Sequence, residues 1–97
     1  MARTMRTEQI APNQIVIFEN DKNKYGLRVF QSYESIIAVY DLDDGSLTLG
    51  KDWDYSKTTV RWLLKFLNDW TNYTGYKSAD IRKAIDTGYI KYDPEMR

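Results

Sequence analysis

Four apolar runs of strand length precede any helical pattern in this sequence, and that order most limits the fold. They cover residues 14–19, 25–33, 35–40 and 46–49, and β-branched and aromatic residues are frequent in them. A polar cluster at 20–24 separates the first two runs, and Asp44-Gly45 supplies a glycine where a hairpin requires a positive φ. The pattern predicts an antiparallel four-stranded meander, one face of which a helix must cover.

The helical pattern follows at residues 56–72. Ser56 is placed to cap it, and five apolar residues recur on one face at helical spacing: Val60, Leu63, Leu64, Leu67 and Trp70. With Trp62 and Phe66 on the flank, the apolar arc spans roughly 200° at about 100° per residue, which is wider than one sheet face requires. A shorter C-terminal helix is predicted over 79–87, capped by Ser78 and ended by Gly88. Residues 89–92 could then form a short fifth strand at a sheet edge.

These elements predict a single α+β domain over residues 13–97, because 97 residues suffice for one compact core and not for two. Residues 1–12 show no periodicity and end at Pro12, so we expect a flexible N-terminal arm that a partner could order. No apolar run approaches the ~20 residues of a membrane span, and the N-terminal residues lack the apolar run of a signal peptide. We therefore expect a cytoplasmic protein that does not contact a membrane.

The chain has no cysteine and no histidine, which removes thiolate nucleophiles, imidazole bases and the usual zinc ligands. The segment from Asp41 to Gly45 resembles part of a calcium-binding loop, but its glycine comes one position early and a hairpin flanks it, which favours a simple turn. The scattered glycines form no phosphate-binding loop. We therefore expect no enzymatic activity, no cofactor and no metal.

Lysine plus arginine equals aspartate plus glutamate at 14 each, so a general electrostatic attraction to nucleic acid is not predicted. The charges are nevertheless unevenly distributed. Residues 41–54 contain five aspartates against Lys51 alone: Asp41, Asp43, Asp44, Asp52 and Asp54. We expect these side chains to form an acidic patch beside a mildly basic C-terminal half.

Two further groups of residues are candidates for binding. Trp53 and Tyr55, at the start of the long helix, could staple and cap it or could take part in recognition. Trp62 and Phe66 could be buried or could belong to an exposed aromatic interface. A basic stripe beside them could contact nucleic acid or be a solvated helix face, and it comprises Arg61, Lys65, Arg82 and Lys83.

Three segments together resemble a pattern in small uncharacterised proteins of bacteriophages and mobile elements of Gram-positive bacteria. They are residues 32–38, 49–59 and 64–67, and the second has the form LGxxWDYSxTT. The resemblance implies a small phage protein that acts by stoichiometric binding to host machinery. Some proteins of this kind are anti-CRISPR proteins that inhibit Cas nucleases.

We therefore expect a non-enzymatic phage-type protein that binds and inhibits or adapts a host protein. A Cas nuclease is one such partner, because the acidic patch could compete for the arginine and lysine groups that hold its DNA. Two alternatives stay open. The chain could be an accessory nucleic-acid-binding domain that uses the basic stripe, or a structural homodimer that pairs through the surplus apolar face of helix 56–72.

Overall fold

The computed structural model describes residues 3–21 and 24–95. Its elements, in chain order, are β1 (Arg3–Ala11), β2 (Gln14–Asp21), β3 (Lys24–Ser32), β4 (Ser35–Asp41), β5 (Leu47–Gly50), α1 (Lys57–Trp70), α2 (Ser78–Thr87) and β6 (Lys91–Asp93).

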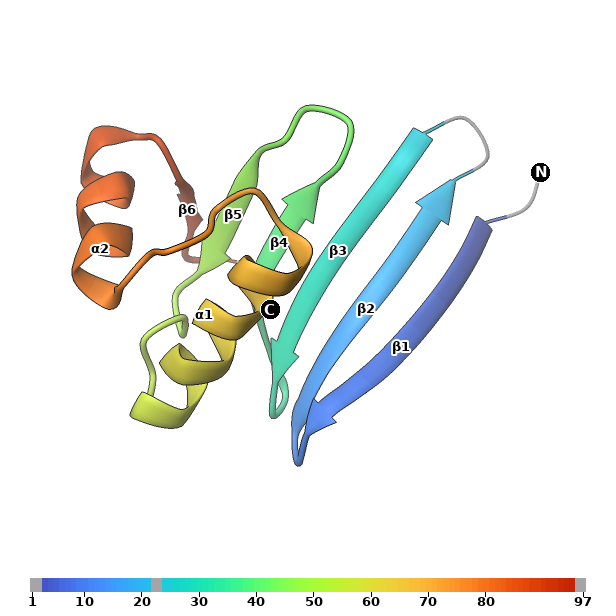
Figure 1. The fold of residues 1–97 in the computed structure, drawn as a ribbon, viewed down its shortest axis with the longest axis horizontal. Helices are drawn as coiled ribbons and strands as arrows, with labels where there is room; N and C mark the ends of the chain where they lie inside the picture. Colours follow the sequence, from blue (N-terminus) through green and yellow to red (C-terminus); the bar gives the residue numbers. More distant parts are fainter. Residues whose placement is uncertain (1–2, 22–23, 96–97) are drawn as a thin grey trace.

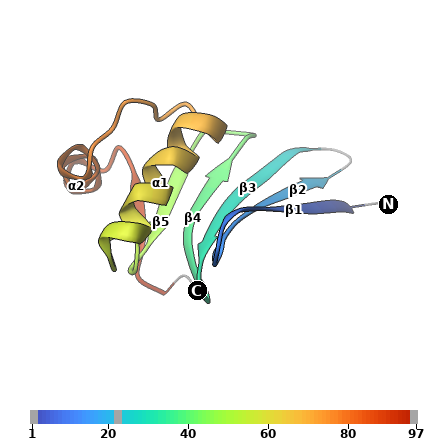
Figure 2. The ribbon, with the colours of Figure 1, turned by 60° about the horizontal axis from the view of Figure 1, so that its bottom comes forward.

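All six strands form one sheet, in which the spatial order from β1 to β6 equals the chain order. Neighbouring strands are antiparallel as far as β5, and β6 then pairs with β5 in parallel after the chain has passed through both helices. Figure 1 shows α1 lying across the middle of the sheet, with α2 beside it near β5 and β6. Figure 2 shows that β1 and β2 extend away from both helices.

The fold is α+β, as the sequence predicted, but the sheet is larger than a four-stranded meander. The four predicted strands correspond to β2–β5, and the short fifth strand corresponds to β6. The remaining strand, β1, corrects the prediction for the N-terminus. Residues 1–12 were expected to form a flexible arm, but they contain β1, which pairs with β2. As a mostly polar edge strand, β1 has too little apolar alternation to reveal itself in the sequence. Positions 1–2 of the predicted arm and 22–23 of the predicted first turn lie outside the described residues.

The core lies between α1 and the sheet face that α1 covers. A cross-strand row on this face consists of Val16, Phe30, Ala38 and Leu49, all fully buried. From α1, the ring of Phe66 stacks on that of Phe30, with 5.7 Å between the centroids. Burial of these side chains holds α1 against the sheet, since an apolar side chain of this size contributes about 1.5–3 kcal/mol when it leaves water.

The opposite face of the sheet is covered by none of the elements that the structure describes. One cross-strand row on this open face carries β-branched residues from five successive strands: Thr7, Ile17, Val29, Val39 and Thr48. Because such side chains pack against their cross-strand neighbours, the three aliphatic members are partly buried without a covering layer.

The ends of α1 are fixed by side chains. Ser56 caps the helix as predicted, because its hydroxyl accepts a hydrogen bond of 3.1 Å from the amide of Thr59. At the other end, Nη1 of Arg28 on β3 donates a hydrogen bond of 2.8 Å to the carbonyl of Trp70. That bond satisfies a carbonyl that the helix itself leaves unpaired.

The second helix begins one residue earlier than predicted. Ser78 is the first residue of α2 instead of its cap, and the carboxylate of Asp80 accepts a hydrogen bond of 2.9 Å from the amide of Lys77. Gly88 ends the helix in the left-handed conformation, with φ 82°, as the sequence predicted. Within the described ranges, neither helix has the length and apolar character that crossing a membrane requires.

The wide apolar arc of α1 is used inside the molecule. Leu63, Phe66 and Leu67 are buried, while Trp62, Leu64 and Trp70 pack against the core from the flanks. No large apolar side chain of α1 is exposed. Most of the apolar arc that suggested a homodimer through this helix is therefore covered within the chain, and its flanks are partly buried.

Candidate functional site

A pocket of about 670 Å³ opens beside the start of α1, and we call it the α1-start pocket. It lies between the β3–β4 turn, the segment that leads from β5 into α1, and the first turn of α1. Its lining residues are Ser32, Tyr33, Glu34, Ser35, Ile37, Asp52, Tyr55, Ser56, Thr58 and Thr59. Most of them carry a hydroxyl group, so a ligand here would meet many hydrogen-bond donors and acceptors.

The β3–β4 turn forms one wall of the pocket. Tyr33 has a φ of 56°, in the left-handed region that a tyrosine rarely adopts and that costs about 1–3 kcal/mol. Its amide donates a hydrogen bond of 2.7 Å to the carbonyl of Asn13, which helps to hold this conformation. The Tyr33 side chain is 51% exposed. The strained backbone therefore presents an aromatic ring at the rim, next to the exposed Glu34.

The segment before α1 forms the opposite wall. Ser35 at the start of β4 donates a hydrogen bond of 3.1 Å to Oδ2 of Asp52, which ties this segment to the sheet. Trp53 is only 5% exposed and anchors the segment in the core, whereas Tyr55 is 75% exposed. Of the two roles that the sequence left open, Trp53 takes the structural one and Tyr55 remains available for recognition.

Hydroxyl groups connect the pocket to the helix cap. The hydroxyls of Ser32 and Thr59 lie 3.2 Å apart in a buried contact, and Ser56 donates a hydrogen bond of 3.1 Å to Oγ1 of Thr59. Because Ser56 is also the cap of α1, the groups that begin the helix also fix the lining of the pocket. A lining held in this way is preorganised for a ligand.

The lining of the pocket is acidic. Glu34 and Asp52 bring two carboxylates, and no lysine or arginine is among the lining residues. The start of α1 contributes a partial positive charge of about half a unit, which two carboxylates outweigh. The exposed rings of Tyr33 and Tyr55 also attract cations through their faces. The pocket therefore favours a cationic group over an anion.

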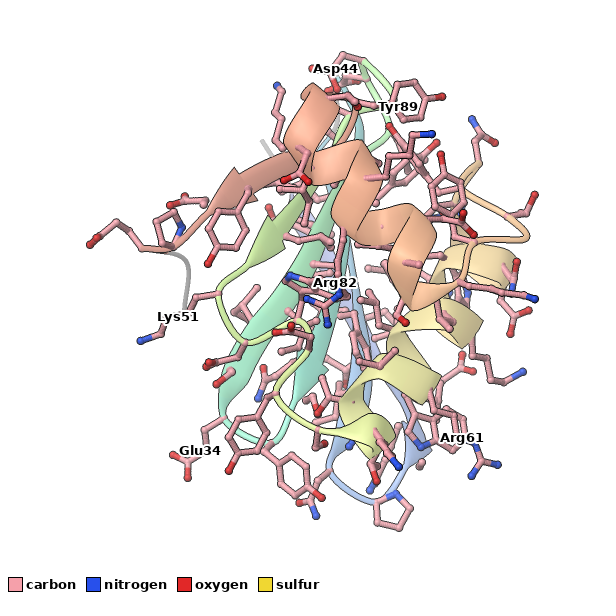
Figure 3. The ribbon with its side chains drawn as sticks, turned by 90° about the vertical axis from the view of Figure 1, so that its left-hand side faces the viewer. Glu34, Asp44, Lys51, Arg61, Arg82 and Tyr89 are labelled. Carbon is pink, nitrogen blue, oxygen red and sulfur yellow. The ribbon has the colours of Figure 1, made fainter. Side chains whose placement is uncertain are left out.

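The acidic patch predicted over 41–54 is divided between two ends of the sheet. Figure 3 shows Asp44 at one end and Glu34 at the other. Strand β4 separates them, because Asp41 ends it and Ser35, which is bonded to Asp52, begins it. The five aspartates therefore do not form a single surface, and only Asp52 lines the α1-start pocket.

The aspartates of the β4–β5 turn have structural partners. Oδ1 of Asp41 accepts the amide of Asp43 at 2.8 Å, and Oδ1 of Asp44 accepts the amide of Ser46 at 2.9 Å. Hydrogen bonds from the side chain and backbone of Ser46 lower the pKa of Asp44 below its usual value. Gly45 has a φ of 71°, as the predicted hairpin turn requires. The structure thus confirms the simple turn in this segment.

A family model described as "Family of unknown function (DUF8033)" matches residues 5–86. The chain belongs to this family. The region matched to DUF8033 contains every residue that lines the α1-start pocket, and it ends before β6. No curated protein and no solved structure matches the chain.

Two of the aromatic residues predicted to bind a partner are core residues in this DUF8033 member. Phe66 is fully buried, and its ring stacks with those of Phe30 and Trp70. Trp53 is likewise buried, and Trp62 is partly buried against the core. Their spacing could not separate burial from exposure, and the close packing of α1 on the sheet decides it.

The predicted basic stripe is interrupted by acidic partners. Nη1 of Arg82 lies 3.1 Å from Oδ2 of Asp54, and the guanidinium lies 5.1 Å from the centre of the Trp53 ring. Nζ of Lys65 lies 3.0 Å from Oδ2 of Asp69. Both pairs are largely exposed, so each contributes at most about 1 kcal/mol.

The four basic residues also lie in different places. Arg61 and Arg82 line a shallow groove between α1 and α2, together with Lys57. Lys83 lines a different hollow between α2 and the loops on either side of it. Figure 3 shows Arg61 and Arg82 well separated from Asp44 and Glu34.

Of the acidic and aromatic residues that line the pocket, Tyr33 and Glu34 were not predicted as site residues. Tyr33 was assigned to the end of the strand predicted over 25–33, and Glu34 was assigned no role. The turn at these two residues depends on a positive φ at a tyrosine, for which the sequence carries no glycine or asparagine signal. Over the described part of the chain, no three side chains of His, Cys, Asp or Glu gather closely enough to hold a metal ion.

Proposed function

We propose that this protein is a non-enzymatic binding module that takes a cationic side chain of a partner protein, lysine or arginine, in the α1-start pocket. The observation that carries the proposal is the composition of this pocket. It combines Glu34 and Asp52 with the exposed rings of Tyr33 and Tyr55, and its lining contains no basic residue.

The physical chemistry of such a lining supports a cation as the ligand. A carboxylate forms stronger hydrogen bonds with a guanidinium or ammonium group than with a neutral donor. An aromatic face adds about 0.5–1 kcal/mol at an exposed site. Tyrosine is also enriched at protein interfaces, because its ring buries apolar area while its hydroxyl keeps a polar contact.

The contact between Ser35 and Asp52 does not by itself favour an enzyme. A lone carboxylate is a much weaker base than a serine alkoxide, so this contact does not by itself activate the hydroxyl as a nucleophile. Ser35 donates to Asp52 in a position that joins two walls of the pocket, and this supports a positioning role for the pair.

A role as inhibitor or adaptor of a host protein is part of the proposal and derives from the resemblance to phage proteins. A Cas nuclease remains one candidate partner, because such enzymes hold nucleic acid with arginine and lysine side chains. The acidic residues lie at two ends of the sheet, so they do not form one continuous surface that could mimic a DNA strand. This arrangement supports the capture of single cationic side chains instead.

Titration of isotope-labelled protein with N-acetyl-arginine amide and N-acetyl-lysine amide tests the proposal by NMR. We expect amide shifts concentrated at residues 33–35 and 52–59, with dissociation constants of about 1 mM or weaker for such small probes. Glu34→Gln should weaken binding about fivefold or more, because it removes one carboxylate and keeps the shape.

Asp86→Asn is the matched control, because it removes one exposed carboxylate from α2 and leaves the pocket unchanged. N-acetyl-glutamine amide serves as the neutral probe. Shifts spread evenly over the surface, or equal weakening by Glu34→Gln and Asp86→Asn, would contradict the proposal.

The groove between α1 and α2 favours one second candidate, an accessory nucleic-acid-binding domain. Lys57, Arg61 and Arg82 line this groove, although Asp54 lines it too and pairs with Arg82. Under this alternative, Arg61→Ala should weaken a gel shift of single-stranded DNA at low salt, and Glu34→Gln should not. No gel shift at low salt would exclude it.

A further inference from the structure

We propose that two copies of this chain pair through β1, so that their sheets join across a two-fold axis at Thr7. This inference goes beyond the proposed function and does not depend on it. Strand β1 is the outer strand of the sheet, and no strand among residues 3–21 and 24–95 pairs with the outer side of its nine residues. Such an edge is a ready template for another strand.

The features that usually block pairing at an edge are weak in β1. Proteins protect edge strands by shortening them, by bulges, or by proline and charged residues, above all lysine, within the strand. β1 is long and contains neither proline nor lysine, and the charged residues near its middle, Arg6 and Glu8, have opposite signs, so they can pair with those of a second copy. Its irregularity lies between Gln9 and Ala11, near one end of the strand.

For two antiparallel copies of β1, the pairing of charged side chains and the length of strand that overlaps favour the same register. Thr7 is the middle residue of Arg3–Ala11, so an axis at Thr7 pairs the whole strand with its copy. In this register Arg6 of each copy lies directly opposite Glu8 of the other. Moving the axis by one residue would instead oppose Arg6 to Arg6 or Glu8 to Glu8. Opposite charges stabilise a cross-strand pair and like charges destabilise it.

The two charged side chains are accessible at this edge. Arg6 and Glu8 are exposed and lie on the side of the sheet that carries α1, since Arg6 pairs with Phe18 and Glu8 with Val16. The guanidinium of Arg6 lies 4.4 Å from the centre of the Phe18 ring, which restrains it over its own sheet. Figures 1 and 2 show α1 well away from β1, so a second copy would meet no helix at this edge.

The same register would also align the β-branched side chains on the open face of the sheet. Thr7 begins the β-branched row that continues through Ile17, Val29 and Val39. With Thr7 opposite Thr7, the rows of both copies form one continuous line across the axis. Threonine pairs of this kind are favourable cross-strand neighbours.

Analytical ultracentrifugation of the wild-type chain and of two charge-reversal variants tests this pairing. The wild-type chain should show a concentration-dependent dimer. Glu8→Arg places arginine opposite arginine, and Arg6→Glu places glutamate opposite glutamate, so each variant alone should dimerise at least about tenfold more weakly. An equimolar mixture of the two variants restores opposite charges at both positions and should restore the dimer.

Disulfide trapping provides a second test that tolerates weak association. The chain has no cysteine, so Thr7→Cys introduces one thiol at the axis, and Asp86→Cys introduces one on α2 as the control. Mild oxidation should link Thr7→Cys into dimers and leave Asp86→Cys largely monomeric, because cross-strand neighbours lie within disulfide distance. Circular dichroism verifies that each variant folds.

Three results would overturn the inference. The first is a wild-type chain that stays monomeric up to about 1 mM, the weak limit of specific association. The second is a mixture of Glu8→Arg and Arg6→Glu that associates no better than either variant alone. The third is equal disulfide linkage of Thr7→Cys and Asp86→Cys.

Discussion

Aspartate and tyrosine side chains gather at both ends of the sheet, but the fold uses them differently at each end. At the β4–β5 turn, Asp41 and Asp44 accept backbone amides of their own turn. At the α1-start pocket, Asp52 shares a lining with Glu34 and with two tyrosines that are more than half exposed. The aspartates of the first end hold their turn together, whereas at the second end only Asp52 has such a role, and Glu34 and the two tyrosines are presented to solvent.

The tyrosines at the turn end show the contrast most clearly. The ring of Tyr73 packs edge-on against Tyr40, Tyr76 and Tyr89, with centroid distances of 6.2, 5.9 and 5.7 Å. Its hydroxyl donates a hydrogen bond of 3.2 Å to the carbonyl of Gly45. This cluster joins the loop before α2, and Tyr89 beyond its end, to β4 and the β4–β5 turn. Residue type therefore does not identify a binding site, and the partners of each side chain do.

Replacing a tyrosine at each end should separate the two roles most strongly. Tyr73→Ala removes a ring that is 8% exposed and should lower the free energy of unfolding by about 3 kcal/mol. Tyr55→Ala removes a ring that is 75% exposed and should change it by no more than about 0.5 kcal/mol. Urea denaturation measures both values. Similar losses for the two variants would mean that the pocket tyrosine is structural as well.

The cap of α1 should have a smaller effect on stability. Ser56→Ala removes the side chain that accepts the Thr59 amide and should cost about 1 kcal/mol. Thr58→Ala, at the neighbouring exposed lining position, should cost less than about 0.5 kcal/mol. Thermal denaturation of the two variants gives the difference. Equal losses of stability for the two variants would contradict the division of the pocket lining into residues that cap α1 and residues that face a ligand.

Alkaline pH should weaken the turn end of the molecule. Burial raises the pKa of Tyr73 above its ordinary value of about 10, and the neighbouring tyrosines raise it further. A raised pKa stabilises the fold below pH about 10, and this contribution is lost as the pH rises toward the folded value. Tyr73→Phe should therefore reduce the loss of stability between pH 8 and 11. Urea denaturation at both pH values tests this expectation.

Acidic pH should have the smallest effect on stability, and this effect should again arise at the turn end. Hydrogen bonds from Ser46 lower the pKa of Asp44, so its contribution is present above the unfolded value of about 4 and is lost as the pH falls through the folded one. Asp44→Asn should make unfolding less dependent on pH below 4. Asp86→Asn provides the control in the same denaturation series. Identical acid profiles for wild type and Asp44→Asn would contradict a role for this carboxylate in the turn.

The sequence predicted those parts of the fold in which local chemistry and burial agree. Asp44-Gly45 marked its hairpin because the turn needs a positive φ, and Ser56 and Gly88 marked helix ends for similar local reasons. Strand β1 was not predicted because its residues are mostly polar and do not alternate clearly, although it forms a hairpin with β2 through the two-residue turn at Pro12 and Asn13.

The candidate site was only partly predictable. Tyr55 and Asp52 were found because they belong to a distinctive segment before the helix. Tyr33 and Glu34 were not, because their place at the pocket depends on a two-residue turn with an unusual φ at Tyr33. The division of the acidic residues was equally hidden, since it follows from the length of β4 and not from the spacing of aspartates.

Binding of N-acetyl-arginine amide by Tyr55→Ala and Tyr89→Ala tests most directly that the α1-start pocket is the binding end. Both tyrosines are exposed, at 75% and 66%, but Tyr89 belongs to the cluster at the turn end. We predict that Tyr55→Ala weakens the arginine-dependent shifts of residues 33–35 and 52–59 severalfold, while Tyr89→Ala leaves them unchanged. Equal weakening by both substitutions, or by neither, would contradict the account.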